Sequence, residues 1–112
     1  MKIRSIWPAL ALAAATVLVA QASYGVETTV IDQVRQRFSL SKISILSGDV
    51  VNYINHDDVQ HNIHIIAADG TEIDRGLQNP GQTIVQKFDR IGEYTVRCSI
   101  HQKMKMKVEV RA

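Results

Sequence analysis

The residues of this chain that can do chemistry gather in one short segment near the C-terminus. Cys98 is the only cysteine, His101 follows three residues later, and Met104 and Met106 complete the segment. Thiolate and thioether sulfur favour Cu(I), whereas imidazole binds both Cu(I) and Cu(II). The segment therefore predicts a site for a copper ion that changes oxidation state, with the distant His61 as a further ligand.

Other chemistries suit these residue types less well. A zinc site could use His61, Cys98 and His101, but methionine is a poor zinc ligand. A cysteine nucleophile activated by His101 would need an oxyanion site, and the sequence offers none. One cysteine and two histidines with a weak axial methionine form the pattern of blue-copper sites. Such a site leaves no open position for a substrate, so we do not expect an enzyme.

Short strands separated by turn residues must position these ligands. Alternation is clearest near the C-terminus, where Tyr94, Val96 and Cys98 share one face of a predicted strand. Residues 32–41 are predicted to be an irregular connection. The predicted strands cover residues 26–31, 43–46, 50–55, 62–67, 83–88, 93–98 and 104–111. Seven or so short strands predict an all-β fold, an antiparallel Greek-key β-sandwich.

The candidate ligands fall at the ends of these strands. Cys98 ends one predicted strand and Met104 begins the next, so the residues between them form a tight loop that can fold His101 over a metal. His61 precedes a different strand and can enter the same end of the sandwich. Strand parity does not choose between Met104 and Met106, because both lie in the same phase.

The first 22 residues have the composition of a secretory signal peptide. Lys2 and Arg4 precede an apolar run over residues 6–20, and small residues follow it. A run of about 15 residues is shorter than the roughly 18 that a spanning helix needs. We therefore expect cleavage before Ser23 and export to the periplasm, with an uncleaved membrane anchor as the alternative. The remainder, residues 23–112, is predicted to be one domain with no membrane span.

Charge and cysteine content narrow the function further. Cleavage would leave 11 basic and 11 acidic residues, so the formal net charge would fall from +2 to about zero. This balance does not suggest nucleic-acid binding. A lone cysteine in an exported protein cannot form an internal disulfide, which favours a metal-ligand role. Lys103, Lys105 and Lys107 either protect an edge strand from pairing or steer an acidic redox partner toward the copper end.

Two segments resemble the amicyanin-type cupredoxins, relatives of plastocyanin and pseudoazurin. Residues 51–65 are similar to the region of the first ligand in that family, and residues 92–104 to the region of the others. The spacing Cys-x2-His-x2-Met is the short-loop form seen in amicyanin. The resemblance implies an axial methionine at Met104, with Met106, which has the spacing of longer-loop relatives, as the alternative. The full implied ligand set is His61, Cys98, His101 and Met104.

The resemblance also implies residues that support the ligands. In the family, an asparagine after the first histidine ties its loop to the hydroxyl residue after the cysteine, and backbone N–H groups donate to the thiolate. Asn62 and Ser99 occupy those places. Ile100 and Gln102 stand where amicyanin-type loops commonly carry proline, so this loop has fewer conformational constraints.

The implied function is that of a periplasmic one-electron carrier, a monomer with one copper ion that cycles between Cu(I) and Cu(II). Its implied partners are c-type cytochromes or a periplasmic dehydrogenase. A periplasmic copper carrier or buffer with the same ligands is the alternative, because the missing prolines leave the rigidity of the loop open. His101 should be the ligand nearest to solvent.

Other polar residues near His61 have simpler interpretations. His56, Asp57 and Asp58 are expected in a solvated turn. His64 lies on the opposite face of its strand from His61 and is expected outside the ligand set.

Overall fold

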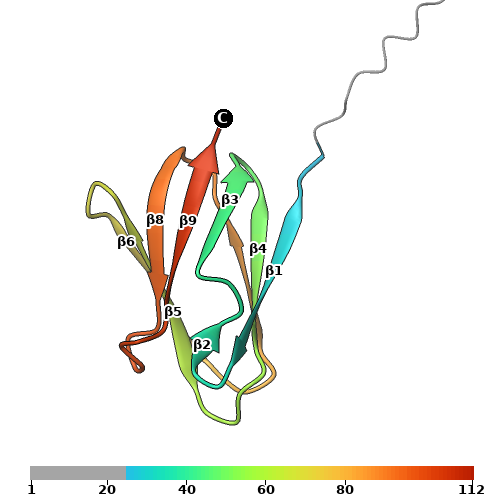
Figure 1. Ribbon diagram of the computed structural model, residues 1–112, viewed down its shortest axis with the longest axis vertical. Coiled ribbons are helices and arrows are strands. Elements are labelled where there is room, and N and C mark those ends of the chain that lie inside the picture. Colours follow the sequence, from blue (N-terminus) through green and yellow to red (C-terminus); the bar gives the residue numbers. More distant parts are fainter. Residues whose placement is uncertain (1–24) are drawn as a thin grey trace, which may run out of the picture.

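Nine short strands make up the fold of residues 25–112 (Figure 1). The structure is a computed structural model that describes residues 25–112. Within that range the helices and strands comprise β-strands only. The strands are β1 Thr28–Val34, β2 Arg37–Phe38, β3 Lys42–Leu46, β4 Val50–Asn55, β5 His61–Ala67, β6 Glu72–Gln78, β7 Thr83–Lys87, β8 Gly92–Arg97 and β9 Lys105–Arg111. The predicted all-β class is confirmed.

The strands form two sheets (Figure 1), one in the order β2-β1-β4-β7 and the other in the order β3-β9-β8-β5-β6. The predicted sandwich is confirmed, but its sheets are mixed rather than wholly antiparallel. β1 pairs with β4 in parallel, and β3 pairs with β9 in parallel. The chain between β1 and β4 crosses to the other sheet as β3, and such a crossover returns the chain in its original direction.

The inner faces of the two sheets form the hydrophobic core. Alternation in β8 and β9 buries Val96, Met106 and Val108, each at most 1% exposed. From the other sheet, Ile31 and Tyr53 are fully buried. Burying an apolar side chain of this size stabilises the fold by about 1.5–3 kcal/mol. This packing fixes the strand ends that carry the candidate ligands.

The segment predicted to be an irregular connection contains a β-hairpin. β1 extends to Val34, which pairs with Arg37 of β2. Arg35 and Gln36 form the turn between them, with φ angles of 54° and 57°. Left-handed φ at both positions is typical of a type I′ turn, which normally uses Asn or Gly. The sequence therefore carried no signal for this hairpin.

Two edge assignments also differ from the predictions. β6 is absent from the predicted strands because six of its seven residues are exposed and show no alternation. It forms one edge of its sheet, beside β5. β9, in contrast, lies between β3 and β8. The edge-protection interpretation of Lys107 is therefore wrong, because the ladder with β3 includes Lys107. Lys107 pairs instead with Glu93 at 3.7 Å.

The N-terminal prediction is not tested by the fold. The predicted signal peptide, residues 1–22, lies outside the described residues. Within residues 25–112 the structure contains no helix with the length and apolar character needed to cross a membrane.

Candidate metal centre

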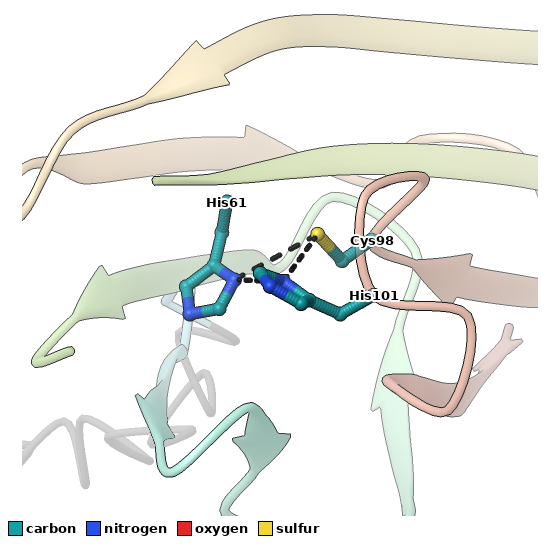
Figure 2. A group of neighbouring side chains, drawn as sticks. All are labelled: His61, Cys98 and His101. Atoms are coloured by element: carbon teal, nitrogen blue, oxygen red, sulfur yellow. Dashed lines mark hydrogen bonds between the residues drawn. The ribbon is translucent and has the colours of Figure 1, made fainter. Parts of the chain in front are cut away.

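Three of the predicted ligands meet at one end of the second sheet (Figure 2). His61 is the first residue of β5, and Cys98 follows directly after β8. Because β5 and β8 are paired strands, their ends bring these two residues together. His101 lies in the loop between β8 and β9, and its ring points toward the other two side chains.

The three donor atoms form a compact triangle. Cys98 Sγ lies 3.7 Å from Nδ1 of His61 and 3.7 Å from Nδ1 of His101, and the two Nδ1 atoms are 3.1 Å apart. The point equidistant from these atoms is about 2.0 Å from each, close to metal–imidazole distances of about 2.0–2.1 Å and metal–thiolate distances of about 2.3 Å. The three residues therefore fit a single metal ion at their centre.

A carboxylate fixes the orientation of the His61 ring. Nε2–H of His61 donates to Oδ2 of Asp57 at 2.6 Å, which leaves the lone pair of Nδ1 directed into the triangle. His61 is fully buried and the side chain of Asp57 is 10% exposed, so solvent scarcely reaches this contact. A carboxylate–histidine pair of this kind fixes the tautomer and the orientation of the ring.

This contact corrects the prediction that Asp57 lies in a solvated turn. Its carboxylate also accepts the backbone N–H groups of Arg35 and Gln36, at 2.5 and 2.9 Å. Burial opposes ionisation, but the hydrogen bonds from these two N–H groups and from His61 outweigh it and lower the pKa of Asp57. Asp57 lies in an irregular loop, where spacing in the sequence predicts no contact, so no signal could have found it.

Comparison with known proteins establishes the family. The family model for copper binding proteins of the plastocyanin/azurin family matches residues 25–111. This chain belongs to that family. The methylamine utilization protein MauL of Methylorubrum extorquens is 34% identical over 65 residues, which are 58% of this chain and 57% of that protein. The plastocyanin of Ulva arasakii is 31% identical over 81 residues, which are 65% of this chain and 83% of that protein.

Solved structures of amicyanin share the fold of this cupredoxin. A reduced amicyanin variant is 26% identical, with a TM-score of 0.68 over 82% of this chain and 88% of that one. The matched part of this chain spans only 57% and 38% of the length of two MauL proteins. The predicted resemblance to amicyanin-type cupredoxins is confirmed, and copper is the metal of this family.

The fold of this cupredoxin separates the two methionines that strand parity left equivalent. Both are 1% exposed. The backbone N–H of Cys98 donates to the carbonyl of Met104 at 3.1 Å, whereas Met106 pairs with Val96, two residues further along the ladder. Directly opposite residues of antiparallel strands have Cβ atoms about 4.5–5.5 Å apart. Met104 is therefore the methionine that lies opposite Cys98.

The four candidate ligands of the cupredoxin differ in their exposure to solvent. His101 is half-buried, whereas His61, Cys98 and Met104 are each at most 1% exposed. His101 is thus the nearest of these side chains to solvent, as predicted. The neighbouring Ile100 is 50% exposed and adds an apolar contact surface beside the ring.

Asn62 links the two segments that carry the ligands. Its backbone N–H donates to Cys98 Sγ at 3.4 Å, and its side-chain Oδ1 accepts the backbone N–H of Ser99 at 2.6 Å. Its Nδ2 donates to Asp74 at 3.1 Å. The side chain of Asn62 therefore binds the backbone of Ser99 rather than its hydroxyl group. The Ser99 hydroxyl instead contacts His64 Nδ1 at 3.1 Å.

Replacing Asn62 by alanine should leave copper binding intact but lower the reduction potential. The backbone hydrogen bond from Asn62 to the thiolate stabilises the electron-rich reduced state. Loss of the Asn62 side chain frees Ser99 and loosens this hydrogen bond, so the reduced state becomes less favourable. A net hydrogen bond contributes about 1 kcal/mol, so we expect a decrease of some tens of millivolts, since a tenfold change in a one-electron equilibrium corresponds to about 59 mV. Redox titration measures it. An unchanged potential and spectrum would remove Asn62 from this role.

The remaining described histidines lie outside the triangle, as predicted. His56 Nε2 is 3.0 Å from Asp32 in an exposed pair. His64 contacts Ser99 through Nδ1, and its Nε2 is 3.5 Å from Glu72. His64 therefore supports the ligand loop from the outer face of β5.

Proposed function

We propose that this cupredoxin is a one-electron carrier whose type 1 copper ion is held by His61, Cys98, His101 and, axially, Met104. The triangle of Sγ and two Nδ1 atoms carries the proposal, because its centre lies at bonding distance from all three. One thiolate, two imidazoles and a weak thioether are the donor set of blue-copper sites. Copper bound there would supply a one-electron Cu(I)/Cu(II) couple.

The protein would hold this donor set in one arrangement for both oxidation states. Asp57 orients the ring of His61, and the backbone N–H of Asn62 supports the thiolate of Cys98. These hydrogen bonds come from residues outside the triangle. They would therefore hold the ligands in place in both oxidation states of the copper ion. Small rearrangement on charge transfer favours fast electron exchange, and the half-buried His101 edge is the proposed route to a partner.

A copper carrier or buffer is the alternative function, and it would need a site that releases the metal readily. The absence of proline at Ile100 and Gln102 favours such release. The hydrogen bonds that close the loop, from Met104 N–H to the His101 carbonyl and from Cys98 N–H to the Met104 carbonyl, favour a rigid electron carrier. The rate of metal release therefore separates the two functions.

The direct test is to add Cu(II) to the purified protein and to record its visible absorption and electron paramagnetic resonance spectra. An electron carrier should show an intense band at about 600 nm and a narrow parallel copper hyperfine splitting, the signature expected of a trigonal copper–thiolate site. It should also retain copper against a chelator and show a reversible one-electron potential. A weakly coloured complex that loses copper rapidly to the chelator would instead support the buffer.

We also propose that residues 1–22 direct export and that the domain of residues 23–112 acts in the periplasm as a monomer without a membrane span. Its partners there would be c-type cytochromes or a dehydrogenase. Four protein ligands leave no position for a substrate, and the balanced charge does not favour nucleic acid, so neither catalysis nor nucleic-acid binding is part of the proposal. The intact mass of the periplasmic protein tests cleavage before Ser23.

A further inference from the structure

Two cationic segments that are remote in sequence meet in a groove beside the ligand loop. The groove has a volume of about 610 Å³ and is lined by residues of the β1–β2 hairpin and of the loop before β9, both in the lower half of Figure 1. Arg35 and Arg37 contribute from the hairpin, and Lys103 and Lys105 from the other segment. His101 also lines the groove, and none of the described residues lining it is acidic.

The four cations of this basic groove are not used in ion pairs. All four side chains are exposed, and no ion pair found within residues 25–112 involves them. Four other cations of the described residues do have acidic partners, among them Arg90 with Asp69 and Lys87 with Asp89. Arg75, Arg97 and Arg111 form no ion pair within residues 25–112 either. Four of the seven cations that form no ion pair within residues 25–112 therefore line one groove beside His101.

Structural roles account for little of this charge. Arg37 lies on β2, an edge strand, where a charge can prevent pairing between molecules. Lys105 begins β9 and pairs with Arg97 of β8, while the ladder of β9 with β3 begins two residues later, at Lys107. Arg35 and Lys103 lie outside the strands. The backbone of Arg35 is held by Asp57, but its guanidinium takes no part in that contact.

We infer that the basic groove docks an acidic surface of the protein that exchanges electrons with this cupredoxin. The inference rests on the proposed function, and it selects steering of an acidic partner as the role of Lys103 and Lys105. Cations from both walls would attract carboxylates to the groove and orient them against the His101 ring. Charge complementarity raises association rates more than it strengthens binding, which suits a transient redox contact of less than about 1,200 Å².

The test compares two double variants with the same change in charge. Arg37→Glu with Lys103→Glu reverses charge on both segments of the groove. Lys87→Glu with Arg111→Glu is the matched control, since both residues lie at the strand ends opposite the ligand loop. The reduced copper-loaded proteins are mixed with hexacyanoferrate(III), which takes one electron from the protein and becomes hexacyanoferrate(II).

The groove variant should react with hexacyanoferrate(III) at least about tenfold more slowly than the wild type at low ionic strength, since electrostatic steering changes association rates by about 10–10³. Reaction with the cationic oxidant tris(phenanthroline)cobalt(III) should become faster. Salt should reduce both differences, and the control variant should change each rate by less than about threefold. Equal effects of the two double variants would overturn the inference, because only net charge would then matter.

A second measurement does not depend on copper. Poly-L-glutamate, a chain of carboxylates, is titrated into the isotopically labelled metal-free protein, and backbone amide shifts are followed by NMR. We expect saturable shifts at residues 35–38 and 101–105 of the wild type and at least a tenfold weaker affinity in the groove variant. Absence of shifts there, or equal shifts in both double variants, would overturn docking at the groove. Failure of the proposed function would appear separately, as a wild-type protein without the copper–thiolate band.

Discussion

Replacing Cys98 by serine should abolish the intense visible absorption of the copper-loaded protein and weaken copper binding by at least about 100-fold. Changes to groups that merely support metal ligands cost about 10–100-fold in affinity, and this change removes the thiolate itself. A serine hydroxyl stays protonated at neutral pH and is a poor ligand for Cu(I). Visible spectroscopy and competition with a chelator of known affinity measure the two effects.

Met106→Leu is the matched control for Cys98→Ser, because it also removes a buried sulfur atom from the same sheet. Met106 pairs with Val96 rather than with Cys98, and exchange of methionine for leucine usually costs less than about 1.5 kcal/mol. Its visible band should therefore survive. Urea unfolding of the metal-free proteins shows whether each variant is folded. A folded Cys98→Ser protein that keeps the intense band would disprove the ligand assignment.

Asp57→Asn should raise the reduction potential and weaken copper binding by about 10–100-fold. The carboxylate accepts three N–H groups, from the His61 ring and from the backbone of Arg35 and Gln36. Asparagine has one acceptor oxygen, and its amide N–H₂ must then face at least one other donor. The loss of negative charge behind His61 also makes the oxidised, more positive ion less favourable. On this basis the potential should increase by about 50–100 mV, since about 59 mV corresponds to a tenfold change.

Asp57→Asn should also destabilise the metal-free protein by about 1–3 kcal/mol, the cost of leaving buried donors without a charged acceptor. Asp58→Asn is the control, because Asp58 is exposed and its substitution makes the same change in charge at the adjacent position. Urea unfolding and redox titration should detect no comparable effect in that control. Equal shifts in potential for the two variants would mean that general electrostatics, rather than the contact with His61, sets the effect of Asp57.

The Asp57 contact also explains how an unusual hairpin is maintained. Residues other than glycine in the left-handed region cost about 1–2 kcal/mol each, and Arg35 and Gln36 both adopt it. The carboxylate of Asp57 satisfies the two backbone N–H groups of this turn while it orients His61. The hairpin of one sheet is thereby connected to a metal ligand of the other sheet, so changes in the turn should reach the copper centre.

The strands could be predicted where burial imposes a period of two on the chain. In β8, Tyr94 and Val96 point inward and Cys98 follows in the same phase, so local alternation alone placed the cysteine sulfur toward the core. β6 escaped prediction because solvent covers most of its side chains. The β1–β2 hairpin escaped because its turn residues lack the usual chemistry and are stabilised by a contact from outside the hairpin.

The kind of metal followed from the sequence by itself, because the softness of sulfur and imidazole donors is a property of the residue types and does not depend on their neighbours. Only the tertiary structure decided that Asp57 holds His61 and that two arginines join Lys103 and Lys105 around His101. Each of these depends on atoms far apart in the chain that meet through strand pairing and sheet packing, for which spacing along the sequence carries no information.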